Sequence, residues 1–316
     1  MDNPAAARRA LPLPADLDMR ALARPELAGT RELRVFDGAV SYFELAYATP
    51  PGFRPLVLDL HVPQSRDGAA IPVVVYAHGG GFFGGMRAMG PWAFLLPAGY
   101  AVASVDYRLS GECRFPGPVH DVAAAVRWVR AHAGEYGLDP DAVVGFGSSA
   151  GAYLVSAVGL AGDDHPELTG SLGPFPQVSC GLAAVVDHFA PTDFLRFDED
   201  SGPGIVEPAN APRTSAARFL GFVPSERPDD AERASLCRYV TSASVPFLIA
   251  HGDGDHRVDI AQSRRLHVAL TRAGVRAELV VIRGADHGSA EFDQAPLHER
   301  TLEFLASLAL REHARR

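Results

Sequence analysis

Short runs of β-branched residues alternate with stretches of helical periodicity from residue 56 onward, and this alternation restricts the fold more than any other feature. Strands that alternate with helices build a largely parallel sheet with helices on both faces. Several runs are apolar throughout, as is typical of central strands. We therefore predict an α/β fold with a mostly parallel central sheet. The predicted strands are Leu56–Val62, Val73–Ala77, Ala101–Val105, Ala142–Phe146, Leu182–Phe189, Pro246–Ala250 and Glu278–Ile282.

Three segments between and after these strands have helical periodicity. Apolar residues recur at helical spacing through His120–His132, and we expect Gly134 to end that helix. A second predicted helix covers 258–270 and ends at Gly274, and a third closes the chain over Thr301–Leu310.

The domain organisation follows from two segments that break the rhythm. Residues 1–30 are rich in Ala, Pro and Arg, and we interpret them as an N-terminal extension that could belong to a cap. Residues 31–316 then form one α/β domain. Within it, Pro, Asp and Glu crowd 191–240. Such an insertion between late strands predicts a lid over the carboxyl ends of the sheet, where α/β folds bind ligands. The alternative is a solvated excursion.

Composition excludes several classes of function. The 316 residues carry a net charge of −9, which disfavours nucleic acids and anionic membranes as partners. All 29 basic residues are arginine, so Schiff-base catalysis and a phosphate-binding P-loop lysine are excluded. The three cysteines form no CxxC pair, and no metal-ligand spacing occurs, so we predict neither a metal nor another cofactor. With no apolar leader at the N-terminus, we expect a cytoplasmic protein.

A G-x-S-x-G motif lies directly between a predicted strand and a predicted helix, with Ser149 at its centre and Gly147 and Gly151 at its ends. A serine on so tight a turn is exposed above the sheet edge, and the small flanking residues permit the strained backbone. The same stretch also fits a dinucleotide fingerprint, Gly145-x-Gly147-x-x-Ala150. That interpretation is disfavoured because the motif follows several strands instead of opening the first βαβ unit.

Three consecutive glycines, at 79–81, follow the strand that ends at Ala77. Bare backbone at this position suggests that N–H groups approach a ligand. Together with the amide of Ala150, they would form an oxyanion hole that stabilises negative charge on a carbonyl oxygen.

A serine nucleophile needs a base, and the base needs an acid to orient it. On such a fold the acid and then the histidine follow the serine in the chain. Asp255 and His287 follow the last two predicted strands, and we select them. Asp253 is the competing acid, whereas His251 and His256 are expected to fix their loop.

Three aromatic residues flank the predicted site. Phe82, Phe83 and Tyr153 are candidates to line a substrate pocket, although aromatic residues beside such a turn are as often part of the core.

The motifs HGGGFFGG, GFGSSAGAY, VVDHFAPTDF, HGDGDHRV and GADHG, in this order, resemble the α/β-hydrolase family. Within it the chain is similar to bacterial feruloyl-esterase-like and hormone-sensitive-lipase-like carboxylesterases, over about residues 30 to 310. The resemblance implies Ser149 as nucleophile, His287 as base and Asp255 as orienting acid. It also implies an oxyanion hole built from the amides of Gly80, Gly81 and Ala150. Phe82 replaces a frequent Trp, and Ala152-Tyr153 replaces a common Gly, so the substrate is not transferable.

The predicted activity is hydrolysis of a small-molecule ester through an acyl-enzyme, without a cofactor. A formamidase similar to kynurenine formamidases, or a hydrolase or eliminase of a specialised metabolite, would use the same three residues. A small-molecule receptor on a hydrolase scaffold is the alternative from another class. The sequence leaves open whether the chain forms a homo-oligomer.

Overall fold

The computed structural model describes residues 32–33, 35–64, 68–202 and 204–308. Its centre is a nine-stranded sheet in the order β1-β2-β3-β5-β4-β6-β7-β8-β9. The six strands β5, β4, β6, β7, β8 and β9 are mutually parallel, whereas β1, β2 and β3 pair antiparallel at one edge. The predicted mostly parallel α/β sheet is therefore confirmed. The strands are β1 Glu32–Leu33, β2 Ala39–Ala48, β3 Leu56–Pro63, β4 Ile71–Ala77, β5 Ala101–Val105, β6 Leu138–Ser148, β7 Ala184–His188, β8 Phe247–Gly252 and β9 Ala277–Ile282.

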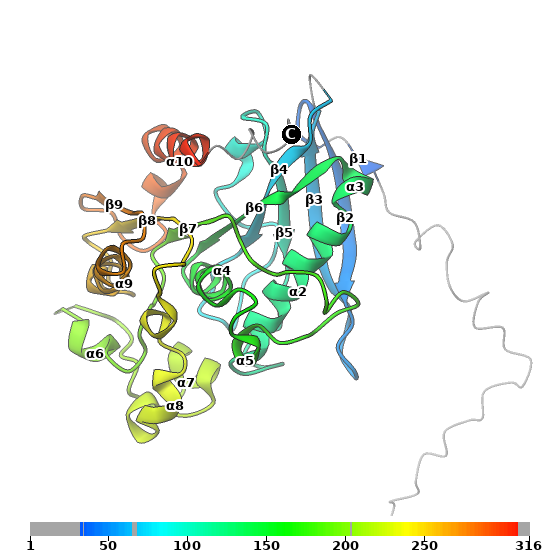
Figure 1. The fold of residues 1–316 in the computed structure, drawn as a ribbon. Helices are drawn as coiled ribbons and strands as arrows, with labels where there is room; N and C mark the ends of the chain where they lie inside the picture. Colours follow the sequence, from blue (N-terminus) through cyan, green and yellow to red (C-terminus); the bar gives the residue numbers. More distant parts are fainter. Residues whose placement is uncertain (1–31, 34, 65–67, 203, 309–316) are drawn as a thin grey trace, which may run out of the picture.

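Helices cover both faces of this sheet (Figure 1). Apolar residues of α2, α4 and α9 pack with one face in a single large cluster. The opposite face packs against η2 and α10. In β7, Val185 belongs to the first cluster and its neighbours Ala184 and Val186 to the second, as expected when successive side chains point to opposite faces. The principal elements of these layers are α2 Gly117–Ala131, α3 Ala133–Tyr136, α4 Ala150–Ala161, α5 Pro166–Thr169, α9 Ile260–Arg272, α10 Ala295–Ser307 and η2 Ala93–Leu95.

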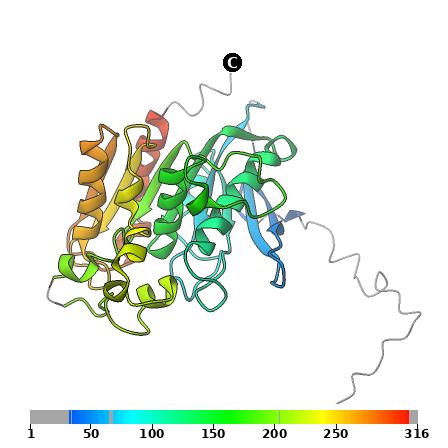
Figure 2. The same ribbon diagram turned by 60° about the horizontal axis from the view of Figure 1, so that its bottom comes forward.

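Residues 191–240 lie between β7 and β8 as a group of short helices. The figures show α6, α7 and α8 together at one end of the sheet (Figure 1 and Figure 2). We call residues 191–240 the insertion. The insertion contains α6 Phe197–Asp200, α7 Ser215–Leu220, η3 Pro224–Glu226, α8 Pro228–Glu232 and η4 Leu236–Tyr239, and η5 Ala290–Asp293 follows β9.

Several details differ from the sequence prediction. The strands β1 and β2 were not predicted, and α10 begins at Ala295, before the predicted start at Thr301. Gly134 does not end the helix predicted over His120–His132. That helix, α2, stops at Ala131, and Gly134 lies within α3. Gly137, whose backbone is in the left-handed region, ends α3. The predicted end of α9 is confirmed: Gly274 has a φ of +79°. The N-terminal extension and the last residues of the predicted C-terminal helix lie outside the described residues.

Candidate active site

Ser149 stands at the sharp turn from β6 into α4, with φ 54° and ψ −118°. Its N–H donates to the carbonyl oxygen of His188 over 2.8 Å, which fixes the turn to β7. The flanking glycines have a steric reason. A Cβ on Gly147 would lie 2.4 Å from backbone of Gly151, and one on Gly151 would lie 2.0 Å from the Ala77 carbonyl oxygen. A backbone conformation of this kind costs about 1–3 kcal/mol, which the surrounding packing has to offset.

His287 connects this serine to a carboxylate. Its Nε2 lies 2.9 Å from Ser149 Oγ, and its Nδ1 lies 2.7 Å from Asp255 Oδ2. The three residues come from loops that follow β6, β8 and β9, so the parallel sheet brings together groups that are remote in sequence. Because a carboxylate only accepts hydrogen bonds, the Nδ1–H donates to Asp255 and Nε2 is free to accept from the serine hydroxyl.

Asp255 is held as a carboxylate by four donors. Its Oδ1 accepts from the backbone N–H groups of Arg257 and Val258 at 2.8 and 2.9 Å. Its Oδ2 faces His287 Nδ1 and also His251 Nε2, the latter at 3.2 Å. Burial on its own would raise the pKa of Asp255, but the hydrogen bonds from His251 and His287 outweigh burial and hold that pKa well below its usual range. Asp255 therefore stays ionised at neutral pH.

The other acid and histidine candidates of this region lie elsewhere. Asp253 Oδ1 accepts from the N–H of Gly284, and its side chain is exposed. His256 is exposed and contacts Asp286. His251 fixes the loop, as expected, because its Nε2 lies 2.8 Å from the Val258 carbonyl oxygen. In addition it contacts the same carboxylate oxygen as His287, which sequence reasoning did not foresee.

The glycine loop packs directly against the nucleophile turn. A Cβ on Gly79 would lie 3.0 Å from the Ser148 carbonyl oxygen, and one on Gly80 would lie 2.2 Å from the carbonyl oxygen of Gly84. Gly80 and Gly81 both have positive φ, at 128° and 59°, which an L side chain rarely adopts. The backbone therefore has to be bare here.

Three amides of this region are free to meet a ligand. Within the described chain, the N–H groups of Gly80, Gly81 and Ala150 donate to no protein acceptor. His78 braces the loop, since its Nδ1–H donates to the Gly79 carbonyl oxygen over 2.7 Å. Burial lowers the pKa of His78, so this ring is neutral and adds no charge beside the amides.

A cavity of about 1040 Å³ opens above Ser149 and His287. The glycine loop forms one side, and the insertion contributes an apolar wall that includes Phe194, Phe197 and Pro208. Glu207 also lines the cavity, where its carboxylate accepts from the Ser215 hydroxyl over 2.6 Å. The insertion therefore covers the nucleophile with a mostly apolar surface.

Two of the three predicted pocket residues line this cavity. Phe82 is a buried lining residue that stacks on Phe219 with ring centroids 3.9 Å apart. Phe83 also lines the cavity, and its side chain is exposed. Tyr153 does not line it. Its side chain is buried in the core, and its hydroxyl donates to the Ala234 carbonyl oxygen over 2.8 Å. Since α4 is buried along its whole length, the sequence could not orient Tyr153.

Phe189 is a site residue that the sequence did not reveal. Its ring meets that of His287 edge to face, with centroids 4.6 Å apart, and its backbone φ is 52°. A buried acid holds this turn: Asp187 Oδ1 accepts from the N–H of Ala190, and Oδ2 accepts from the Ser156 hydroxyl. Burial raises the pKa of Asp187 to about 6. A Phe in the left-handed region has no sequence signature.

Among the residues that the structure describes, no group of three or more His, Cys, Asp or Glu side chains is arranged to hold a metal ion. In the same ranges, no helix is long and apolar enough to cross a membrane.

A parallel sheet with this strand order, a serine on the turn after β6, and a histidine and an acid after β9 and β8 define the α/β-hydrolase fold. The chain belongs to the BD-FAE family, whose model matches residues 58–270.

Proteins that are similar to this chain in sequence or structure are named as esterases. Esterase LipQ of Mycobacterium tuberculosis is 29% identical over 231 residues, which cover 71% of this chain and 52% of LipQ. Isoprenylcysteine alpha-carbonyl methylesterase ICME of Arabidopsis thaliana is 28% identical over 280 residues, which cover 82% of this chain and 60% of ICME. The chain thus spans little more than half the length of these curated relatives. A truncated carbohydrate esterase from gut microbiota superposes with a TM-score of 0.77 at 28% identity, covering 85% of this chain and 95% of that one.

Proposed function

We propose that this protein is a serine carboxylesterase that hydrolyses a small-molecule ester. The observation that carries the proposal is the continuous contact from Asp255 through His287 to Ser149, at 2.7 and 2.9 Å, at the floor of a cavity. The names of the relatives, which are esterases, support the same class of reaction.

The reaction begins when His287 Nε2 takes the proton of Ser149 and the serine oxygen attacks the ester carbonyl carbon. Asp255 keeps the other ring proton on Nδ1, so that Nε2 is the basic nitrogen. The imidazolium that forms lies against a carboxylate that stays charged.

The negative charge that develops on the carbonyl oxygen is received by the free N–H groups of Gly80, Gly81 and Ala150. One donor of this kind contributes about 2.7–4 kcal/mol to the transition state. These amides are fixed by the positive φ of the glycines and by the start of α4, so the donors do not have to reorganise during the reaction.

His287 then gives its proton to the alcohol oxygen as the C–O bond breaks, which leaves an acyl group on Ser149. A water molecule, deprotonated by the same nitrogen, attacks the acyl carbon. The acid leaves and the serine recovers its proton. The apolar wall from the insertion favours an ester with at least one apolar half.

The test compares Ser149→Ala with Ser148→Ala on two panels of substrates, one of p-nitrophenyl esters and one of formamides. Ser148 is the neighbouring hydroxyl and also lines the cavity, which makes it the matched control. We expect Ser149→Ala to lose up to about 10⁶-fold in kcat, and Ser148→Ala to keep turnover within about tenfold. Turnover that survives in Ser149→Ala refutes the nucleophile. Faster turnover of formamides than of esters refutes the ester specificity.

A further inference from the structure

A second cavity, of about 590 Å³, lies between α9 and the insertion and shares no lining residue with the cavity above Ser149. Arginine dominates its lining, with five arginines against two acids, in a chain whose net charge is −9. We call this second cavity the arginine groove. Its arginines are Arg196, Arg238, Arg264, Arg265 and Arg272.

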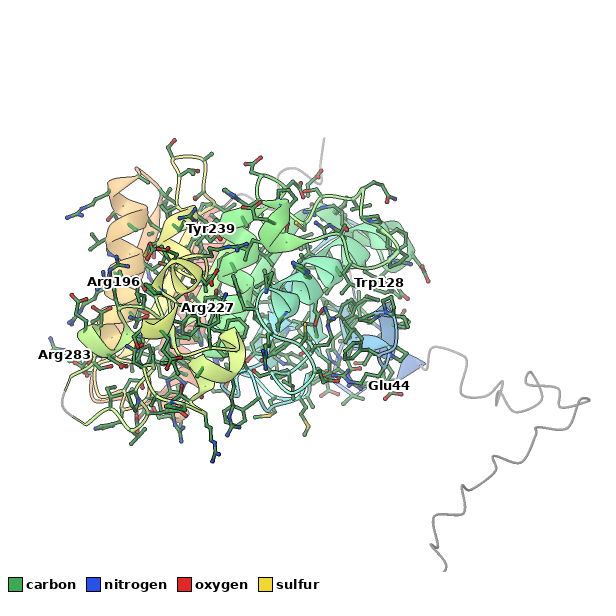
Figure 3. All side chains as sticks on the ribbon, turned by 90° about the horizontal axis from the view of Figure 1, so that it is seen from below. Glu44, Trp128, Arg196, Arg227, Tyr239 and Arg283 are labelled. Carbon is green, nitrogen blue, oxygen red and sulfur yellow. The ribbon has the colours of Figure 1, made fainter. Side chains whose placement is uncertain are left out.

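Two of the five guanidinium groups are already neutralised. Arg196 Nη1 lies 2.8 Å from Asp193 Oδ2 and 3.3 Å from Glu232, so it uses both acids of the groove. Figure 3 shows Arg196 beside α9. Arg265 forms a two-point ion pair with Asp200. Five positive charges against the three negative charges of Asp193, Glu232 and Asp200 leave the groove with a net charge of +2.

The remaining three arginines have no ion-pair partner among the described residues. All three are exposed. Arg238 lies on η4, whereas Arg264 and Arg272 lie eight residues apart on α9, a rise of about 12 Å along the helix. Val268 lies between them at 42% exposure and adds an apolar side chain to the lining.

We propose that the arginine groove binds a small anion that carries phosphoryl groups. The guanidinium fork matches phosphoryl oxygens with two parallel hydrogen bonds and is more weakly hydrated than an ammonium group. The separation of Arg264 and Arg272 suits an extended anion better than a single phosphate. The three unpaired arginines come from both walls, Arg238 from the insertion and Arg264 and Arg272 from α9, so an anion held by both walls would link the insertion to α9.

Binding is measured by calorimetry and by thermal shift, at constant ionic strength, with inorganic phosphate, pyrophosphate and tripolyphosphate. We expect affinity to rise along this series. The double variant Arg264→Gln/Arg272→Gln should bind pyrophosphate at least about tenfold more weakly, because it loses two charged hydrogen-bonding groups. Arg283→Gln removes the same charge from an exposed arginine outside the groove and should change affinity less than about twofold.

The readout is binding, so the outcome does not depend on the proposed esterase activity. Melting temperatures without ligand check that the variants are folded. The affinity of Arg238→Gln for pyrophosphate tests the insertion wall of the groove alone. Three results would each overturn the proposal: no pyrophosphate binding up to about 10 mM, equal affinity in the wild type and the double variant, or an equal loss in Arg283→Gln, which indicates unspecific attraction.

Discussion

Replacement of Asp255 by Asn tests how the histidine is oriented. Both oxygens of Asp255 accept hydrogen bonds, Oδ1 from two backbone N–H groups and Oδ2 from two histidine nitrogens. An asparagine of the same shape has only one acceptor oxygen. The backbone donors cannot change, so the oxygen faces them and the NH₂ group faces His287. The ring must then accept at Nδ1 and carry its proton on Nε2, toward Ser149.

A histidine in that tautomer cannot take the serine proton. The comparable substitution in a serine protease lowers kcat about 10⁴-fold, equivalent to about 5.4 kcal/mol in the barrier, and we expect a similar loss here. The assay is kcat for a p-nitrophenyl ester at pH 7, with the melting temperature measured in parallel. Asp253→Asn is the matched control, since Asp253 contacts Gly284 and is exposed, and it should retain turnover within about threefold. If Asp255→Asn stays within tenfold of wild type, or Asp253→Asn loses as much, the assigned acid is wrong.

The remaining predictions concern packing and titration. Gly151→Ala should destabilise by about 3 kcal/mol or more, seen as a lower melting temperature, because its Cβ would lie 2.0 Å from backbone oxygen, whereas Gly134→Ala, with open space around it, should not destabilise. Equal effects would contradict the steric argument. Tyr153→Phe should cost about 1 kcal/mol in unfolding free energy and leave KM unchanged, while Phe83→Ala should raise KM; a shifted KM in Tyr153→Phe would place that ring on the cavity. The pKa of Asp187 is raised to about 6 above an unfolded value near 3.9, so the folded state takes up the proton first and stability rises as pH falls from about 6 toward 4. Asp187→Asn, which does not titrate, should be more stable than wild type by up to about 3 kcal/mol above pH 6, a difference that shrinks toward pH 4 in denaturant titrations; a pH-independent difference would refute the assignment.

Most of the parallel sheet could be predicted because most of its strands are apolar runs that Gly, Pro or Asp residues bound. β4 and β5 are buried at every position, and their predicted ranges differ little from the observed ones. β2 was not predicted because it lies near the antiparallel edge of the sheet and only part of it is buried. A register shift between Tyr42 and Leu45 also breaks its alternation, with Glu44 at a φ of 58°.

The candidate site could be predicted from the sequence where a reactive side chain follows the end of a predicted strand. Ser149, Asp255 and His287 each follow a strand, and parallel strands bring their carboxyl ends to one edge. What could not be predicted depends on tertiary packing. The ring of Phe189 reaches His287 only because its backbone adopts a rare conformation, and the contact of His251 with Asp255 depends on how one loop folds back on itself.

The most direct measurement is the site of covalent modification by a fluorophosphonate. The protein is treated with the reagent, cleaved after arginine, and analysed by mass spectrometry. We expect a single adduct on Ser149, none on the adjacent Ser148, and a large loss of labelling rate in His287→Ala. A protein that stays unmodified, or that carries the adduct on another residue, would contradict the central claim that His287 activates Ser149.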